Sequence, residues 1–534
     1  MRHRILVTDD IDPEGIAILA AEPRLEIDVV PTLAVPELLD RIDQYDAMIG
    51  RSATKVSPEL LRRGTRLRVI GRAGVGVDNV AMDVATELGI AVINAPAGNT
   101  VAVAELFFGV MLGLLRHVPT AATSMREGRW DRSALLGSEL RGKALGIVGL
   151  GRIGGEVATR AHAFGMTLLG YDPYVADARF TGLRVRRMST LDELLAEADV
   201  VTVHTPLTEE TTGLLGRREL SRMTPGAYVA NLARGGIVDD SALAQALESG
   251  HLRGAALDVF AVEPLPADHP IRRAPHVLLT PHLGASTVEG QRNVAVDACI
   301  GVRDALLRGD VSRSINVAAV SGAEWGELQA AMLIAQRAAA LARAVLAGQG
   351  LRAIRRLSLR CGPELIGAGN ALLSAAALGL LEGVLETDRL NMINARALAE
   401  QRGIELAMTE VNQLESPYAL EVALAGGMQE LAVGGVATPG VTARITRIGS
   451  YHVDVAPRKT LIVLTNNDVP GVIGRVGTLL GDAGVNIAEW HQARLAQGGE
   501  ALAAISVDSP VPADVCKALL ELPDVLSATT VNFR

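Results

Sequence analysis

Short apolar runs alternate with amphipathic helical patterns from the start of the chain to about residue 316. Near-continuous apolar runs of this kind are typical of parallel strands buried on both faces of a sheet. The predicted strands are ILVT (5–8), AMIG (47–50), LRVIG (67–71), AVIN (91–94), ALGIVGL (144–150), TLLGYD (167–172), VVTVH (200–204), YVANL (228–232), AALDVF (255–260) and VLLT (277–280). These are too many for one small sheet, so the pattern predicts two α/β domains.

Helix boundaries divide this region further. Asn99 is the predicted N-cap of a long helix, which places a domain boundary near residue 98. A second long helical pattern runs from Thr287 to Arg308 and leads into an exposed linker, GDVSRSINV. We therefore expect two doubly wound, Rossmann-like domains, the first formed by residues 1–98 and 285–316 and the second by residues 99–284.

The C-terminal third has a different pattern. Residues 317–456 combine Ala-rich helical segments with short strands, and the Gly-rich stretch LAGGMQELAVGGVATPG is typical of hairpins, so we expect an α+β intervening domain. The helical segments are predicted at Leu328–Ala347, Ala371–Leu385 and Asn394–Gln401. Residues 457–534 follow a βαββαβ order, which predicts a ferredoxin-like domain.

Composition narrows the class of protein. Hydrophobic residues make up 49% of the 534 residues and charged residues 21%, which is enough apolar material for packed cores. The formal charge of −9 and the 3% aromatic content argue against a nucleic-acid or anionic-membrane partner. The three cysteines predict neither a disulfide framework nor a metal site, and the N-terminus lacks the pattern of a signal peptide. The expected location is cytoplasmic.

The segment GLGRIG has the G-x-G-x-x-G spacing directly after a predicted strand and before a helical pattern. Gly149 permits the tight turn, Gly151 lets the backbone approach a pyrophosphate, and Gly154 lets the helix pack closely on the strand. The N–H groups of Arg152 and Ile153 would then face the phosphates. This pattern predicts a dinucleotide site.

A carboxylate at the end of the next strand indicates which dinucleotide binds. Asp172 follows Gly154 by 18 residues and would accept hydrogen bonds from the hydroxyls of the adenosine ribose. The same carboxylate would repel a 2′-phosphate, so NAD is favoured over NADP. Arg179 lies close enough in sequence to suit a 2′-phosphate instead.

Polar residues follow three later strands, where open α/β sheets place their ligands. His282 suits a general base for a hydroxyl proton, because its unperturbed pKa lies near neutrality. Glu263 beside it would orient the ring and stabilise the imidazolium. Arg234 offers a planar fork to a 2-hydroxy carboxylate, and Asp258 would face the nicotinamide side of the cofactor. Taken singly, each residue also has an ordinary structural explanation.

On these motifs the chain resembles the D-isomer-specific 2-hydroxyacid dehydrogenase family, and within it the long branch that oxidises 3-phospho-D-glycerate at the start of serine biosynthesis. The matching segments are RSATKV, GRAGVGVDNV, NAPAGNT, GLGRIG, YDP, VHTPLT, NLARGGIVDD, AALDVF-x-x-EP and PHLGAST. The resemblance implies that Arg234, Glu263 and His282 are the catalytic trio. It also implies NAD contacts at Val75, Arg152, Ile153, Asp172, Thr205, Ala233, Asp258, His282, Gly284 and Ala285.

Two N-terminal arginines bear on substrate choice. Arg51 and Arg72 suit a second anionic group such as a phosphate, although solvated surface arginines would explain them equally well without the resemblance. The backbone of Gly74, Val75 and Gly76 could form a nest for the substrate carboxylate. The resemblance further implies that Trp130 and Arg132 reach the site from a neighbouring subunit, which requires a dimer or tetramer.

The resemblance implies the NAD-dependent oxidation of 3-phospho-D-glycerate to 3-phosphohydroxypyruvate. Two alternatives stay open. One is a glyoxylate/hydroxypyruvate reductase or other D-2-hydroxyacid dehydrogenase, and the other is a non-catalytic, NAD-sensing binding protein of the same fold.

The last domain resembles an ACT domain, a module that binds amino acids and pairs side by side across subunits. Its loop NNDVPGVIG implies that L-serine binds at Asn466, Asp468 and Asn486, and the alternative is a plain oligomerisation lobe. In the intervening domain, Arg396 and Arg402 are weaker candidates for binding an anion.

Overall fold

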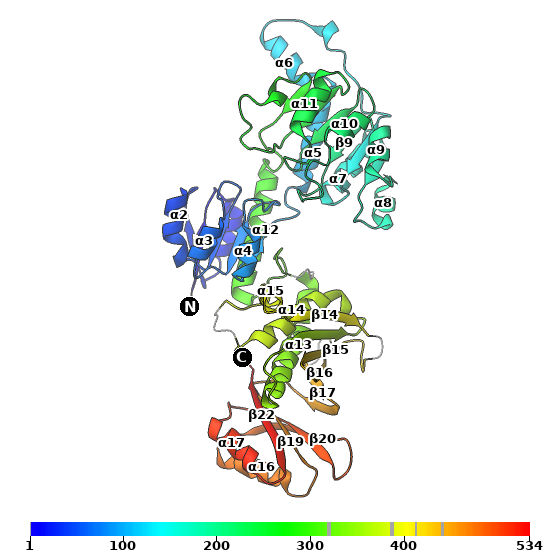
Figure 1. Cartoon of the computed structure of the whole chain (residues 1–534). Helices are drawn as coiled ribbons and strands as arrows, with labels where there is room; N and C mark the ends of the chain where they lie inside the picture. The colour runs from blue at the N-terminus through cyan, green and yellow to red at the C-terminus, as the bar shows by residue number, and fades with distance from the viewer. Residues whose placement is uncertain (1, 318–321, 385–388, 412–413, 439–442, 534) are drawn as a thin grey trace.

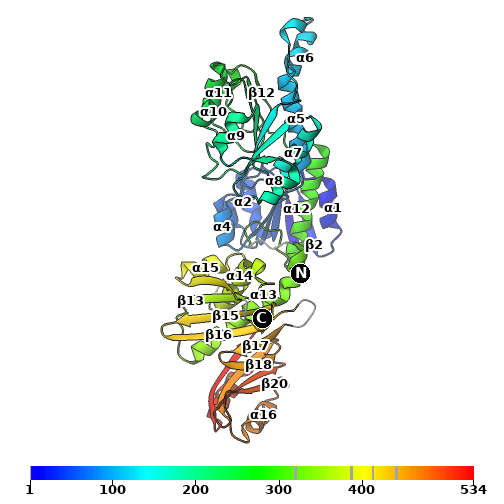
Figure 2. The ribbon, with the colours of Figure 1, turned by 90° about the vertical axis from the view of Figure 1, so that its right-hand side faces the viewer.

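The computed structural model describes residues 2–317, 322–384, 389–411, 414–438 and 443–533. Figure 1 shows four units arranged one after another along a single axis, and Figure 2 shows the same order after a quarter turn. The unit built on β6–β12 lies at one end and the ferredoxin-like unit at the other. The N-terminal unit lies second, so the N-terminus is near the middle of the molecule.

The N-terminal unit holds a parallel five-stranded sheet of doubly wound order. Its strands in spatial order are β2 (Leu25–Val29), β1 (His3–Val7), β3 (Ala47–Gly50), β4 (Val69–Arg72) and β5 (Ala91–Ile93). Its helices are α1 (Pro13–Ala20), α2 (Val35–Arg41), η1 (Ile42–Gln44), α3 (Pro58–Arg63) and α4 (Met82–Glu87). Strand β2 was not predicted, because this edge strand carries acidic residues between its apolar ones and lacks a continuous apolar run.

The second unit holds a parallel seven-stranded sheet. Its strands in spatial order are β12 (Val277–Leu279), β11 (Gly254–Leu257), β10 (Tyr228–Asn231), β9 (Val200–Val203), β6 (Ala144–Val148), β7 (Thr167–Tyr171) and β8 (Arg186–Arg187). The helices are α5 (Thr100–Leu115), α6 (Val118–Arg126), η2 (Arg132–Ala134), α7 (Arg152–Ala163), α8 (Asp177–Leu183), α9 (Leu191–Glu197), α10 (Arg217–Arg222), α11 (Asp240–Glu248) and η3 (Pro270–Arg273). The strand order reverses between β6 and β9, which is where a fold of this kind binds its ligand.

Two long helices, α5 and α12 (Val288–Arg308), connect the first unit and the second. Asn99 stands at the N-cap of α5 as predicted, but its side chain makes no capping hydrogen bond, contrary to the prediction. Helix α12 packs against α1 so closely that a Cβ on Gly15 would lie 2.9 Å from the backbone of Ala295. Beyond it, Ser314 forms a bridge to Ile93 of β5. The predicted domain boundaries themselves stay predictions.

The third unit is a mixed six-stranded sheet with helices on it. The strands in spatial order are β14 (Glu405–Glu410), β13 (Arg356–Cys361), β15 (Ala419–Gly426), β16 (Gln429–Val436), β17 (Arg444–Ile448) and β18 (Tyr451–Val455). The helices are α13 (Gly322–Gly348), η4 (Ile366–Ala368), α14 (Gly369–Leu381) and α15 (Ala395–Gln401). The predicted hairpin is the β15–β16 pair, and both its last residues at 439–440 and the predicted helix end at Leu385 lie outside the described residues.

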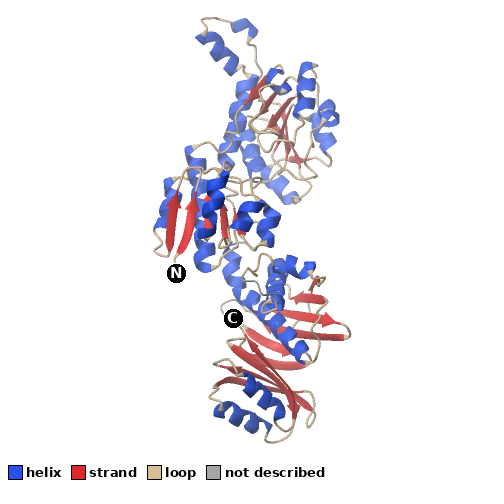
Figure 3. Cartoon of the chain, turned by 60° about the vertical axis from the view of Figure 1, so that its left-hand side comes forward, coloured by secondary structure: helices blue, strands red, loops and turns tan. Residues whose placement is uncertain are grey.

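Within α13, Leu328–Gly348 is long and apolar enough to cross a membrane by length and composition. Half of this segment is buried, and α13 packs against α14, β15 and β16. A core helix passes the same test, and the packing identifies α13 as one. Figure 3 shows the helices of this unit lying against its sheet.

The last unit confirms the predicted βαββαβ order. Its sheet runs β20 (Ile487–Arg494), β21 (Glu500–Val507), β19 (Thr460–Asn467) and β22 (Val525–Asn532), with α16 (Val472–Asp482) and α17 (Ala513–Glu521). Residues from this sheet, among them Leu461 and Val531, share a hydrophobic cluster with α13. The Arg337 guanidinium also lies 5.1 Å from the ring centre of Phe533. The third and fourth units are therefore packed together.

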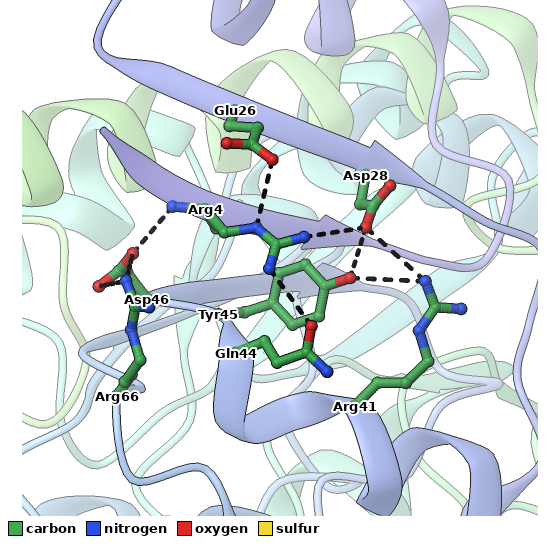
Figure 4. A network of polar contacts seen from close by, with 8 residues as sticks. All are labelled: Arg4, Glu26, Asp28, Arg41, Gln44, Tyr45, Asp46 and Arg66. Carbon is green, nitrogen blue, oxygen red and sulfur yellow. Dashed lines mark hydrogen bonds and ion pairs between the residues drawn. The ribbon is translucent and has the colours of Figure 1, made fainter. Parts of the chain in front are cut away.

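A polar network fastens one edge of the first sheet (Figure 4). The buried side chain of Tyr45 donates its hydroxyl hydrogen to Asp28, and Arg41 pairs with the same carboxylate at 3.7 Å. Arg4 stacks over the Tyr45 ring with its guanidinium carbon 5.0 Å from the ring centre. Burial and the Asp28 carboxylate raise the pKa of Tyr45, so the phenol stays neutral and remains a donor.

We predict that Tyr45→Phe lowers the free energy of unfolding of the first unit by about 1 kcal/mol, the usual worth of one hydrogen bond. Because the folded-state pKa of Tyr45 is raised, its contribution is complete below the unfolded-state pKa and is lost as pH rises through the folded-state value. Urea unfolding of both proteins at pH 8 and at strongly alkaline pH measures this difference. A difference that stayed constant or grew with pH would contradict the assignment.

Candidate active site

The predicted dinucleotide loop follows β6 at the point where the strand order reverses. Gly149 has a φ of 92°, in the left-handed region that favours glycine. A Cβ on Gly154 would lie 2.0 Å from the carbonyl oxygen of Gly149, so a side chain there would separate helix from loop. Gly151 is the N-cap of α7, whose first residues are Arg152 and Ile153. The unpaired N–H groups of this helix start can therefore face an anion.

Two polar side chains next to this loop fit a dinucleotide. Asp172 accepts hydrogen bonds from the backbone N–H of Leu150 at 2.8 Å and of Tyr174 at 2.9 Å, which fixes its carboxylate beside the loop. The hydroxyl of Thr205 is buried and has no hydrogen-bond partner in the described part of the chain. A buried hydroxyl without a partner is costly unless a ligand satisfies it.

The guanidinium of Arg179 is bonded to the cofactor loop and is not available for a 2′-phosphate. Its Nε donates to the carbonyl of Leu150 at 3.0 Å and a terminal nitrogen donates to the carbonyl of Gly151 at 2.8 Å. The guanidinium is thus engaged in supporting the loop. The glycine cradle, Asp172 and the Thr205 hydroxyl together fit NAD.

His282 and Glu263 meet as the sequence analysis expected. The imidazole Nδ1 lies 2.7 Å from a Glu263 carboxylate oxygen, and the other oxygen of Glu263 accepts the backbone N–H of Phe260 at 3.0 Å. A carboxylate held at both oxygens fixes the ring and places the hydrogen on Nδ1. The opposite nitrogen, Nε2, is then free to accept a proton.

Arg234 stands in a turn after β10 that a buried asparagine organises. The side-chain oxygen of Asn231 accepts the N–H of Ala233 at 3.1 Å, and its amide donates to the carbonyl of Arg234 at 2.9 Å. A Cβ on Gly235 would lie 1.8 Å from the carbonyl oxygen of Phe260, so this turn packs directly on the loop that leads to Glu263. The role of Asn231 in this turn was not predicted, because the residue looks like an ordinary end of a strand.

Asp258 is 1% exposed, and its carboxylate holds the loop that carries His282. It accepts hydrogen bonds from the Thr280 hydroxyl at 2.6 Å and from the N–H groups of Leu283 at 2.7 Å and Gly284 at 2.8 Å. Most of its acceptor capacity is therefore used within the chain. Arg234, Glu263 and His282 follow β10, β11 and β12, three neighbouring strands, and so lie at one edge of the sheet.

Arg51, Arg72 and Arg234 come from both units and lie close enough to affect one another. Burial lowers the pKa of Arg72 to about 10, and the positive charges of Arg234 and Arg51 contribute to the same shift. The Nε of Arg72 is buried without a partner, and no carboxylate lies within ion-pair distance of Arg51 or Arg72 among the described residues. Mutually repelling cations with unused donors form a site for an anion of more than one charge.

The glycines of the predicted nest make room for two of these arginines. A Cβ on Gly74 would lie 1.3 Å from a terminal nitrogen of Arg72, and one on Gly76 would lie 2.0 Å from a terminal nitrogen of Arg234. The N–H of Gly74 donates to the Arg72 carbonyl, so the N–H groups left for a nest are those of Val75 and Gly76. The carbonyl of Val75 accepts the Asn94 amide at 2.6 Å.

Asp78 of the first unit forms an ion pair with Arg234 of the second. This role was not predicted from the sequence. The Asp78 carboxylate lies 2.9 Å from the Nε of Arg234, so this ion pair links the unit of the first sheet to the unit of the second. The residue belongs to the GRAGVGVDNV segment, but a negative charge was not expected in a site for anions. The ion pair fixes Nε, and Nη1 donates to the carbonyl of Ala233 at 2.7 Å, so Nη2 is the nitrogen left for a substrate.

Other predicted residues lie elsewhere. Trp130 is 78% exposed and, with Arg132, follows α6, which projects from the end of the molecule in Figures 1 and 2. Within one chain these two residues do not join the arginines. Arg396 donates to the Asn370 side chain at 3.1 Å and Arg402 to the Leu398 carbonyl, so neither forms an anion site with the other.

The predicted effector residues lie at two ends of one sheet. Asn466 is buried and accepts the Gln492 amide at 3.1 Å, and Asp468 accepts Arg494 at 3.0 Å. A backbone N–H and the Arg494 guanidinium lower the pKa of Asp468. Asn486 instead donates to Asp508, next to the opposite end of β19. Seven strand residues separate the two ends, which is about 24 Å.

Comparisons with known proteins agree with this geometry. Residues 108–284 match the family model of the D-isomer specific 2-hydroxyacid dehydrogenase, NAD binding domain. The chain is 38% identical to the D-3-phosphoglycerate dehydrogenase of Synechocystis over 99% of this chain and 94% of that protein. It is also 38% identical to the D-3-phosphoglycerate dehydrogenase of Bacillus subtilis over 99% of both chains.

A solved structure extends the comparison to the first two units. D-Lactate dehydrogenase from Aquifex aeolicus, crystallised with NAD and lactic acid, is 28% identical and covers 58% of this chain and 97% of its own, with a TM-score of 0.52. The two doubly wound units, the glycine loop and the full-length relatives lead to one assignment. The chain belongs to the D-3-phosphoglycerate dehydrogenases, a branch of the D-isomer specific 2-hydroxyacid dehydrogenase family, and is an NAD-dependent oxidoreductase.

Proposed function

We propose that this enzyme oxidises 3-phospho-D-glycerate to 3-phosphohydroxypyruvate in the cytoplasm, as a homo-oligomer under feedback control by L-serine. The observation that carries the proposal is the meeting of Arg51, Arg72 and Arg234, together with the packing of the Arg234 turn against the loop that leads to the His282–Glu263 pair. A substrate with a carboxylate at one end and a phosphate at the other matches three guanidinium groups.

His282 is the proposed base. Its Nε2 accepts the proton of the C2 hydroxyl, and Glu263, 2.7 Å from Nδ1, stabilises the imidazolium that results. NAD, when bound along the glycine loop, supplies the acceptor for the hydride that leaves C2. One proton and one hydride thus leave the substrate, and a ketone remains.

Arg234 is the proposed anchor of the substrate carboxylate. Asp78 holds its Nε and the carbonyl of Ala233 holds Nη1, so the guanidinium is fixed and Nη2 would donate to the acid and to the C2 oxygen. Arg51 and Arg72 would bind the phosphate, with Trp130 and Arg132 contributed by a second copy of the chain. Trp130 is exposed beyond helix α6, which projects from the end of the molecule, and this position supports a contribution to the site of a second copy.

Serine control is proposed from the ferredoxin-like unit. Strand β20 is an edge of its sheet, and the third unit contacts it near its start, where Glu489 accepts hydrogen bonds from Ala456 and Arg444. In the proposal, β20 strands of two copies pair antiparallel along this edge. This pairing would bring Asn486 of one copy toward Asp468 of the other and complete a site that one chain cannot form. Carboxylate and amide groups suit the ammonium and carboxylate of an amino acid.

We predict that His282→Ala lowers kcat by about 100-fold or more, while KM for 3-phospho-D-glycerate changes little, since loss of general base catalysis acts on the chemical step. The rate of NADH formation measures it. His452→Ala is the matched control, because His452 also pairs with a glutamate, at 3.2 Å, but lies in the third unit. Normal turnover in His282→Ala would reject the proposed base.

We predict that Arg51→Ala and Arg72→Ala each raise KM for 3-phospho-D-glycerate about tenfold or more and change KM for D-glycerate much less, since a charge-assisted hydrogen bond is worth about 1.5–3 kcal/mol. Arg68→Ala, exposed at the opposite end of β4, serves as the control. Equal losses for both substrates would contradict a phosphate role.

We predict that L-serine slows the wild-type enzyme and that Asp468→Ala and Asn486→Ala each abolish this response without changing the rate in its absence. Steady-state rates over a serine titration measure the effect, and Asp514→Ala on α17 is the control. Wild-type kinetics that stay flat up to millimolar serine would remove the effector from the proposal.

A further inference from the structure

A buried carboxylate at the end of β1 has no place in the proposed mechanism. Asp9 is 5% exposed and lies two residues after the strand. Its oxygens accept four hydrogen bonds, from the N–H groups of Arg51 at 2.7 Å and Thr54 at 3.0 Å and from the hydroxyls of Thr54 at 2.7 Å and Thr32 at 2.8 Å. Three of the four come from the segment 51–54 that begins with the proposed phosphate-binding arginine.

Asn79 binds the backbone carbonyls of the same segment. Its amide donates to the carbonyl of Arg51 at 3.0 Å and to the carbonyl of Thr54 at 2.7 Å. The N–H and C=O groups of both end residues are therefore bonded, the N–H groups by Asp9 and the carbonyls by Asn79. Asn79 also follows Asp78, which pairs with Arg234, so one short loop contacts both arginines.

The backbone at Asp9 lies in a region that favours glycine. Its φ of 66° is uncommon for a residue with a side chain and costs on the order of 1 kcal/mol. Aspartate and asparagine tolerate this region better than most residues. The conformation directs the carboxylate beneath the 51–54 segment, so the four hydrogen bonds offset its cost.

Position matters here because the Arg51 side chain has no ion-pair partner among the described residues. A long free side chain can reach a phosphate in many conformations, and only its backbone fixes the origin of that reach. A small shift of the 51–54 segment would change the distance between Arg51 and the guanidinium groups of Arg72 and Arg234. That distance decides which separation of two anionic groups fits the site.

We propose that Asp9 and Asn79 are positioning residues that clamp the 51–54 segment and thereby set the selectivity of this enzyme for a phosphorylated over an unphosphorylated 2-hydroxy acid. The inference rests on the proposed function, because it assigns Arg51 to the phosphate. Neither residue touches the substrate. Both act through the backbone of Arg51.

The test separates the clamp from backbone strain. Asp9→Gly removes the carboxylate and relieves the positive φ, so loss of selectivity in this variant cannot come from strain. Asp9→Asn keeps one acceptor for the two N–H groups, and the threonine hydroxyls can turn to accept from its amide. Asp10→Gly is the matched control, since Asp10 is the next residue, has a φ of 55° and is exposed. Asn79→Ala removes the clamp from the opposite side.

Two measurements on the enzyme test whether Asp9 and Asn79 set its selectivity by holding the 51–54 segment. The first is kcat and KM for 3-phospho-D-glycerate and for D-glycerate. We expect Asp9→Gly and Asn79→Ala to raise KM for the phosphorylated acid about tenfold and KM for D-glycerate less than about threefold, with kcat nearly unchanged. Asp9→Asn and Asp10→Gly should stay close to wild type.

The second measurement is amide hydrogen exchange of the peptide that contains residues 51–54, which needs no substrate. We expect exchange to accelerate at least about tenfold in Asp9→Gly and to stay unchanged in Asp10→Gly. Unchanged exchange, or an equal rise of KM for both acids, would overturn the clamp. If the wild-type enzyme shows no preference for 3-phospho-D-glycerate, the proposed function is wrong, and so is the selectivity assigned to Asp9. If the wild-type enzyme and the Asp9→Gly variant are equally selective, only this inference is wrong.

Discussion

Burial of Arg72 close to the positive charges of Arg51 and Arg234 is the constraint on which the rest of this site depends. Three cations near one cleft, one of them buried enough to bring its pKa down to about 10, are unfavourable without an anion. Two features keep them there. Gly74 and Gly76 leave the space that two of the guanidinium groups fill, and Asp78 neutralises part of the charge across the cleft. A substrate with two anionic groups would relieve the repulsion among these three charges.

The placement of the cluster between two units links binding to chemistry. Arg234 follows a strand of the sheet that carries the glycine loop, while Arg51 follows β3 and Arg72 ends β4 of the first sheet. In the proposed function, an anion that contacts all three arginines bridges the two units, with its reacting carbon next to His282. The Asp258 carboxylate, fully engaged with the loop of His282, keeps the base in place while this happens.

Sequence reasoning worked where one local pattern determines one structure. Apolar runs located most strands of the two doubly wound sheets, and glycine spacing located the cofactor loop, because both depend on neighbours in the chain. The edge strand β2 and the two-residue β8 escaped because neither has a continuous apolar run. Asp78 and Asn231 escaped for another reason. Their importance comes from partners brought close by the fold, and nothing in their own segments distinguishes them from surface or strand residues. The clamp residue Asp9 likewise read only as the end of a strand.

The most direct test of the central claim is the ratio of kcat/KM for 3-phospho-D-glycerate to kcat/KM for D-glycerate in the wild-type enzyme, followed by NADH formation. If the three arginines form a site for two anionic groups, loss of the phosphate removes at least one charge-assisted contact, so the ratio should be on the order of 10–100 or more. A ratio near one would mean that Arg51 and Arg72 do not bind a phosphate, and the account of the arginine cluster would be wrong.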